Sequence, residues 1–340
     1  DPNFITLNGQ NETTGSTGSE IDFNVNFIGK CPENGSRHAI IKVEYHNYSC
    51  HHLIFVQQGN APVELINGKA KWHTCNLLSA TEEVSSPLDE GSLFKFGNVS
   101  QPIAASNQTH EKAGGYWINI VPGDFKNNAD KEFKIVGTSK TEKWANITSS
   151  TNTNSPEWIN KLNLPKGGRI ASYNDYAELF KSEEIEQGYG VLYGDEASEP
   201  ATDRRDVYEY RSEGTTKGRG MRGCFVYNST TGRSVFFPIG ASGYGHRKNQ
   251  EANGRAVLRY AAGRTEQYPE PGLKERPLFY DLYMRPGAIY WLDKTATATD
   301  THEVIGWDFN FFTFDFNKID TGNVFKVGAS DACFIRCVEE

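Results

Sequence analysis

The sequence LPKGGRIASYNDYAELF, residues 164–180, contains the start of the most convincing helix in the chain. Ser172 or Asn174 can cap it, since a short polar side chain accepts hydrogen bonds from the first free backbone amides. Asp175 favours the positive end of the helix dipole. Apolar side chains three and four residues apart then form one face, which consists of Tyr176, Leu179 and Phe180. We therefore expect a short amphipathic helix here.

A shorter helix and a long loop region precede this stretch. Residues 156–162 predict the earlier helix, with Ser155 as its cap and Pro156 in its first turn. Residues 60–155 are otherwise loop-rich, with polar clusters that cannot bury a core by themselves. Aromatic islands around Trp72 and Trp117 interrupt them.

Strands are expected in quick succession after Gly223. CFVYN and SVFFPIG are apolar runs separated by Asn228–Arg233, which predicts a hairpin in which Gly232 supplies the positive φ. Further apolar runs continue to residue 338. Loops and two helices followed by a strand-rich half predict an α+β domain over residues 61–340.

The first 60 residues predict a separate small domain. In IDFNVNF, residues 21–27, every second residue is apolar, which is typical of a half-buried strand. Similar short runs recur between turn residues, as in an immunoglobulin-like β-sandwich. Residues 1–60 are few for such a fold, so the domain either lacks strands or borrows one from its neighbour. It would act as a spacer or an assembly domain.

Composition narrows the class of protein. The net charge of −8, from 43 acidic and 35 basic residues, gives no general attraction for nucleic acid, so none is expected as a partner. No apolar run approaches the length of a membrane span. We expect an exported protein whose signal segment is absent from this chain. Six cysteines without a CxxC pair leave disulfides and free thiols equally open and disfavour a zinc ribbon.

Six segments, in order, resemble those of a known domain family. They are residues 72–77 with Trp72, EGSLFKFGN at 90–98, residues 164–180, the FFP strand at 235–240, Tyr290 with Trp291, and the terminal Arg336–Val338. Together they cover residues 61–340. This order resembles the Fibrobacter succinogenes major paralogous domain of Bacteroidetes cell-surface proteins. The family's usual RLPT is here Arg169–Ser172, and its Trp-Ser-Ser is Trp291–Asp293.

The resemblance implies a C-type-lectin-like fold, with a twisted antiparallel sheet, two short helices and a long surface loop region. The preceding residues resemble the short immunoglobulin-like modules of such surface proteins. Because a fold does not carry a function with it, the binding site has to be sought in particular residues.

The segment Trp307–Asn310 is the first candidate ligand site. Trp307, Asp308 and Asn310 resemble the aromatic, carboxylate and amide groups with which lectins of this fold hold calcium and sugar. The alternative is an ordinary strand, since apolar and polar residues alternate through the segment. We predict no cofactor and no bound metal.

The loop Ser242–Arg247 is the second candidate site. Glycines flank Tyr244, His246 and Arg247, which could together bind an anionic or carbohydrate ligand. A solvated turn is the alternative. A catalytic role for His246 has little support, because no nearby residue is recognisable as the group that would orient it.

Two other clusters invite chemical hypotheses. Cys333 and Cys337 suggest an oxidase of the formylglycine-generating type, but positions four apart in a strand are too distant for a disulfide or a shared metal. His46, His51, His52 and His73 suggest a metal, although adjacent histidines of a strand point to opposite faces. The resemblance leads us to expect a non-enzymatic adhesion protein of the extracellular surface, which binds glycan or protein and has fimbrial subunits as further candidate partners. A purely structural pilus subunit is the main alternative.

Overall fold

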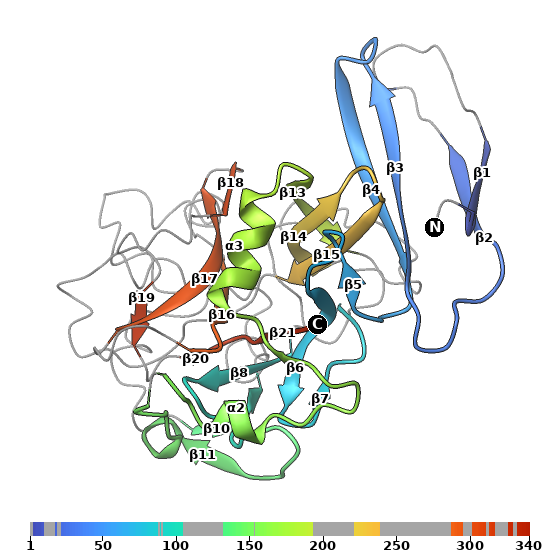
Figure 1. Ribbon diagram of the computed structural model, residues 1–340. Helices are drawn as coiled ribbons and strands as arrows, with labels where there is room; N and C mark the ends of the chain where they lie inside the picture. The colour runs from blue at the N-terminus through green and yellow to red at the C-terminus, as the bar shows by residue number, and fades with distance from the viewer. Residues whose placement is uncertain are drawn as a thin grey trace.

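The chain is rich in strands and has little helix. A computed structural model describes residues 3–9, 18, 22–87, 89, 91–104, 132–152, 154–192, 221–238, 287–294, 301–310, 313–316, 326–328 and 332–340. Among them, the α-helices are α2 (Trp158–Lys161) and α3 (Tyr173–Lys181), and Trp144–Asn146 forms a 3-10 turn. The strands form several small antiparallel sheets (Figure 1). The predicted strand-rich α+β class is confirmed for these residues.

The N-terminal part consists of two two-stranded sheets. β1 (Ile5–Gly9) pairs with β2 (Phe23–Phe27), and β3 (Arg37–Tyr45) pairs with β4 (Cys50–Gln58). One face of each sheet contributes to a small core around Phe4, Ile41 and Val56. The predicted alternation in β2 is confirmed at residues 23–26, where the asparagines are exposed, but Phe27 remains 51% exposed.

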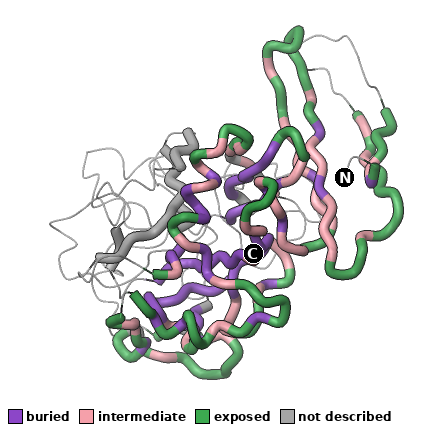
Figure 2. Tube along the Cα trace, viewed as in Figure 1, coloured by how far each residue is buried: buried purple, intermediate pink, exposed green. Residues whose placement is uncertain are grey.

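The other face of the β3–β4 hairpin packs on the main body of the protein. The ring of Phe55 stacks on that of Phe225 at 4.3 Å between centroids and meets Tyr227 edge-on at 4.9 Å. Ile40 and Leu53 contact the same large core. The first 60 residues are therefore attached to the main body through shared apolar contacts. Figure 2 shows that much of the hairpin is of intermediate burial.

A five-stranded sheet joins the beginning and the end of the main body. Its order is β12–β21–β6–β5, and β7 also pairs with β6. Because β21 lies between β6 and β12, residues near 75, 170 and 337 become neighbours. The strands are β5 (Val63–Glu64), β6 (Lys71–Ser79), β7 (Glu82–Glu83), β12 (Arg169–Ile170) and β21 (Arg336–Glu339).

Smaller sheets surround this one. A hairpin forms at Asn228–Arg233 as predicted, with Gly232 at φ +73° and its amide bonded to the Asn228 carbonyl. Three sheets have the orders β13–β14–β15, β20–β8–β9 and β16–β17–β18 with β19 on β17, and β10 pairs with β11. Their strands are β8 (Ser92–Lys95), β9 (Ile103–Ala104), β10 (Glu132–Lys134), β11 (Thr141–Lys143), β13 (Ile185–Leu192), β14 (Met221–Asn228), β15 (Arg233–Pro238), β16 (Gly287–Trp291), β17 (Thr301–Asn310), β18 (Thr313–Phe316), β19 (Lys326–Gly328) and β20 (Ala332–Cys333).

The two helices begin differently from one another. Ser172 caps α3 and forms a capping box with Asp175, so the prediction of a polar cap is confirmed and Ser172, not Asn174, provides it. The predicted cap of α2 is wrong, because that helix begins at Trp158 and Glu157 precedes it without a side-chain cap. Ser155 instead donates its amide to the side chain of Asn152. Burial of Trp158, whose indole donates to the Asp293 carbonyl at 2.7 Å, holds this short helix in place.

The buried side chain of Arg336 holds its own strand, β21, against the main body. Its side chain is fully buried and donates to the side-chain oxygen of Asn76 at 2.8 Å and to the carbonyls of His73 (2.8 Å) and Phe236 (3.0 Å). The guanidinium also lies 4.4 Å from the ring centre of Phe237. A buried charge is tolerated only when it is hydrogen-bonded, so these contacts fix β21 against β6 and β15 together.

We expect Arg336→Met to destabilise the protein by about 3 kcal/mol or more, since it removes the donors of three buried acceptors. Arg336→Lys should also destabilise it, because an ammonium cannot reproduce the planar fork. Urea unfolding followed by circular dichroism measures both effects. The exposed Lys161→Met should change stability by only about 0.5 kcal/mol. If Arg336→Met and Lys161→Met lowered the free energy of unfolding equally, Arg336 would not hold β21 in the way described.

His38 lies at the contact between the hairpin and the main body. It is 4% exposed, and neither ring nitrogen has a hydrogen-bond partner among the described residues. Burial, with a smaller contribution from the charge of Arg233, lowers the pKa of His38 to about 4. The backbone of His38 also approaches the β14–β15 turn at Gly232. The junction therefore requires a neutral imidazole.

We expect acid to weaken the fold through His38. Its pKa is lower in the folded than in the unfolded chain, so its contribution is complete above the unfolded value of 6.5 and is lost as pH falls towards 4. The free energy of unfolding should fall by about 2 kcal/mol more between pH 7.5 and 5 in the wild type than in His38→Leu. Urea unfolding at both pH values measures this, and His51→Leu, at an exposed position of β4, is the control. The same pH dependence in wild type and His38→Leu would refute it.

Candidate functional site

The structure bears on the two predicted ligand sites to different extents. Tyr244, His246 and Arg247 lie outside the described residues. Trp307, Asp308 and Asn310 lie in β17, of which the backbone course and pairing are described. The structure therefore places the segment 307–310 and leaves the binding roles of all six residues as predictions.

The segment 307–310 is part of a central strand. Trp307 pairs with Ala288 of β16 on one side and with Phe316 of β18 on the other. Asp308 pairs likewise with Gly287 and Asp315. A backbone bonded on both sides agrees with the strand interpretation of this segment.

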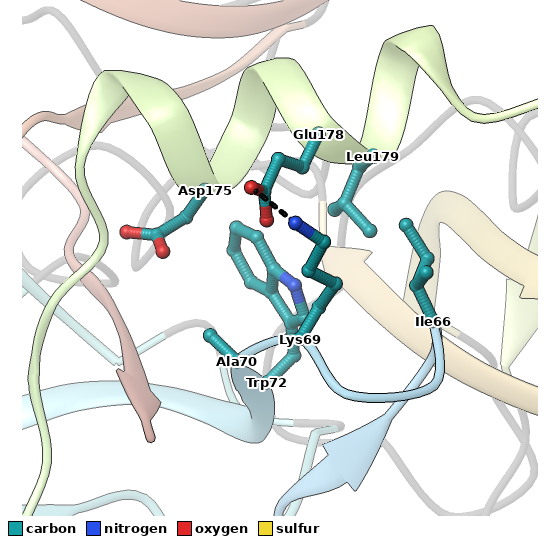
Figure 3. A pocket seen from close by; sticks show the side chains of 7 residues that line it. All are labelled: Ile66, Lys69, Ala70, Trp72, Asp175, Glu178 and Leu179. Carbon is teal, nitrogen blue, oxygen red and sulfur yellow. Dashed lines mark hydrogen bonds and ion pairs between the residues drawn. The ribbon is translucent and has the colours of Figure 1, made fainter.

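A shallow hollow lies where α3 crosses the turn between β5 and β6 (Figure 3). It measures about 210 Å³ with its open side included. Lys69 and Glu178 are partly exposed, whereas Trp72, Asp175 and Leu179 are buried. The lining consists of Ile66, Lys69, Ala70, Trp72, Asp175, Glu178 and Leu179.

An ion pair spans the mouth of the hollow. Lys69 Nζ lies 2.9 Å from Glu178 Oε1, and both side chains are partly exposed. In Figure 3 the ammonium stands between the floor and α3. Solvent-exposed pairs of this kind are worth at most about 1 kcal/mol, so the two side chains separate readily.

The carboxylate at the other side of the hollow is already fully engaged. Asp175 accepts from Arg169 Nη1 at 2.6 Å and Nη2 at 3.0 Å, and from the amide and hydroxyl of Ser172 at 2.6 Å each. Burial raises the pKa of Asp175, but these hydrogen bonds outweigh it and hold the pKa below the ordinary value. The side chain of Asp175 is therefore ionised, and it holds Arg169 and the first residue of the α3 cap in place.

The floor of the hollow is closed by packing. Trp72 is 2% exposed and meets the ring of Tyr176 edge-on at 4.8 Å. The lining has no cysteine, serine or histidine that could act as a nucleophile or base. The arrangement can contact one small polar group of a larger ligand, and it is the candidate binding feature among the residues that the structure describes.

The cysteines and histidines do not form a common centre. All six cysteines are free thiols, and Cys333 and Cys337 are both buried. Burial raises the pKa of the Cys337 thiol well above its ordinary value. His73 lies in β6 with its Nδ1 2.7 Å from Glu83, whereas His51 and His52 are exposed on the hairpin. No group of three potential metal ligands occurs within the described part of the chain.

Several residues of the hollow belong to segments that the sequence had marked, but their proximity was not predicted. Trp72 was recognised as a motif residue, and Asp175 and Leu179 as residues of the helix that became α3. Their proximity depends on β21, which pairs with both β6 and β12 and so brings α3 over the β5–β6 turn. The pair of glycines before Arg169 was the one sign in the sequence that this segment approaches another closely. Gly168 has φ +107°, and a side chain there would lie 2.9 Å from the ring of His73 in β6.

Comparison with known proteins finds no matching family model, no matching curated protein and no matching solved structure. None of the described helices is long and apolar enough to cross a membrane.

We expect Asp175→Asn to cost about 1–2 kcal/mol of stability, since the amide loses the bidentate pair with Arg169 and weakens the cap of α3. The stability difference between Asp175→Asn and the wild type should become smaller in acid. The pKa of Asp175 is lowered by folding, so the stability that its carboxylate contributes is lost as it becomes protonated. Thermal unfolding at pH 7 and pH 3 tests this. Glu157→Gln, which loses only an exposed pair with Lys161, is the control. An unchanged melting temperature for Asp175→Asn would contradict the assignment.

Proposed function

We propose that this chain is a ligand-binding adhesion protein of the extracellular surface of a Bacteroidetes-like bacterium. Residues 61–340 form its C-type-lectin-like binding domain, and residues 1–60 are an immunoglobulin-like spacer or assembly module. The ligand is a glycan or a protein. The protein is exported and is not an enzyme.

The closure of the main body supports the lectin-like assignment. β6 near its start and β21 at its end pair directly, and β12 completes the same sheet before α3 begins. A domain whose ends are joined in this way can present the intervening chain as loops on a fixed frame. Binding residues are frequently found on loops that a rigid scaffold positions.

One observation carries the binding proposal. In the sequence, the candidate loop Ser242–Arg247 begins four residues after the buried FFP strand of β15 ends. Phe236 and Phe237 anchor that strand in the large core. A loop that begins so soon after an anchored strand is held near a fixed position, as binding loops often are.

A glycan array probed with the full chain tests the proposal. We expect binding to at least one glycan class, and at least tenfold weaker binding when Arg247→Ala, Trp307→Ala and Asp308→Ala are compared singly with wild type. Lys161→Ala, on the exposed side of α2, is the matched control. Wild-type binding by all three variants would show that the site is wrong.

A structural pilus subunit is the second candidate function. Within the described residues, each N-terminal sheet has two strands, so a strand of another subunit could add to an edge. The oxidase alternative has less support. Cys333 and Cys337 are buried, and a thiol with a raised pKa is poorly suited to act as a thiolate.

A further inference from the structure

The outer half of β3 is a strand with one partner. β3 pairs residue by residue with β4 and, among the residues that the structure describes, with no other strand. Its first residues lie against the β14–β15 turn, where the backbones of Ala39 and Ile40 approach Gly232. Residues 41–45 continue beyond that contact, on the part of the hairpin that projects from the body (Figure 1). Along its other edge this segment has no strand partner among the described residues, so a strand could be added there.

Exposed apolar side chains are concentrated on the same module. Among described residues, five of the seven large hydrophobic side chains that remain exposed belong to the first 60 residues: Leu7, Phe27, Ile28, Tyr45 and Tyr48. Tyr45 shares a face of β3 with Ile41 and Val43, the face that contributes to the small core. At Tyr45, near the outer end of β3, this face remains exposed to solvent. An added strand would bury more of its apolar surface.

The charges on the outer half of β3 are arranged symmetrically. Lys42 and Glu44 flank Val43, are exposed, and lie 2.7 Å apart. A lysine on an open edge normally opposes strand addition. The opposition disappears when the incoming strand places an acidic side chain opposite the lysine, and cross-strand pairs of opposite charge are favourable.

We propose that two copies of the chain associate through β3, antiparallel and with Val43 opposite Val43 of the second copy. In this register Lys42 of each copy lies opposite Glu44 of the other, and Ile41 lies opposite Tyr45. The two hairpins then form one four-stranded sheet with a twofold axis at Val43. This inference is independent of the ligand-binding function.

The sequence of β3 selects this register over its neighbours. A shift of the partner by two residues in one direction sets Lys42 opposite Lys42, and in the other direction it sets Glu44 opposite Glu44. A shift by one residue joins the apolar face of one copy to the polar face of the other. The central register alone satisfies both the charges and the faces.

Charge reversal on the full chain tests the proposal. Sedimentation velocity should show a reversible dimer for the wild type as concentration rises through the micromolar range. Lys42→Glu or Glu44→Lys alone should raise the dissociation constant about tenfold or more, because like charges then face one another twice. The double variant Lys42→Glu/Glu44→Lys should restore the dimer, and so should an equal mixture of the two single variants.

Two controls make the result decisive. Lys69→Glu makes the same change in net charge on the main body and should leave the dimer intact. Circular dichroism should show that each variant remains folded. A wild-type chain that stays monomeric at every concentration would overturn the proposal. So would a dimer that is insensitive to both single reversals, or one that the mixture of single variants fails to restore.

Discussion

The buried guanidinium of Arg336 is the constraint on which the main body depends. The hydrogen bonds described for it go to neutral oxygens, one of them on Asn76, 260 residues earlier in the chain, and another on Phe236. A cation cannot remain in an apolar core unless these acceptors surround it. In the folded protein, β21, β6 and β15 are therefore held together by one side chain. The last strand thus closes a fold whose decisive contacts are distant in sequence.

The features predicted correctly from sequence are those decided over a few neighbouring residues. The cap at Ser172, the turn at Gly232 and the alternation in β2 each depend on side chains within one turn or strand. The start of α2 was missed because burial of Trp158 against the segment near Asp293 determines it. The hollow beside α3 was missed for a similar reason, since it exists only once β21 has joined β6 to β12. Of the candidate ligand residues, the alternation at 307–310 correctly predicted a strand and could not assign its side chains a role.

The β3–β4 hairpin serves two cores at once. One face packs with Phe4 and the strands of β1 and β2, while Phe55 on the other face stacks on Phe225 of the main body. The N-terminal module is thus oriented by an apolar contact as well as by its covalent linker. Alternation alone could not reveal this, because it marks one face of a strand as apolar without naming the surface that will cover it. A hairpin held in this way keeps its outer edge in a fixed position relative to the loops of the main body.

The buried ionisable groups are largely committed to structure. Arg336 holds the closing strand, Asp175 is engaged by Arg169 and Ser172, and the Cys337 thiol is kept protonated by burial. Catalysis requires ionisable groups that are accessible and poised to change their protonation state, and these are neither. Within the described residues, buried charge therefore serves to hold the strands together, and a partner would meet the exposed side chains instead.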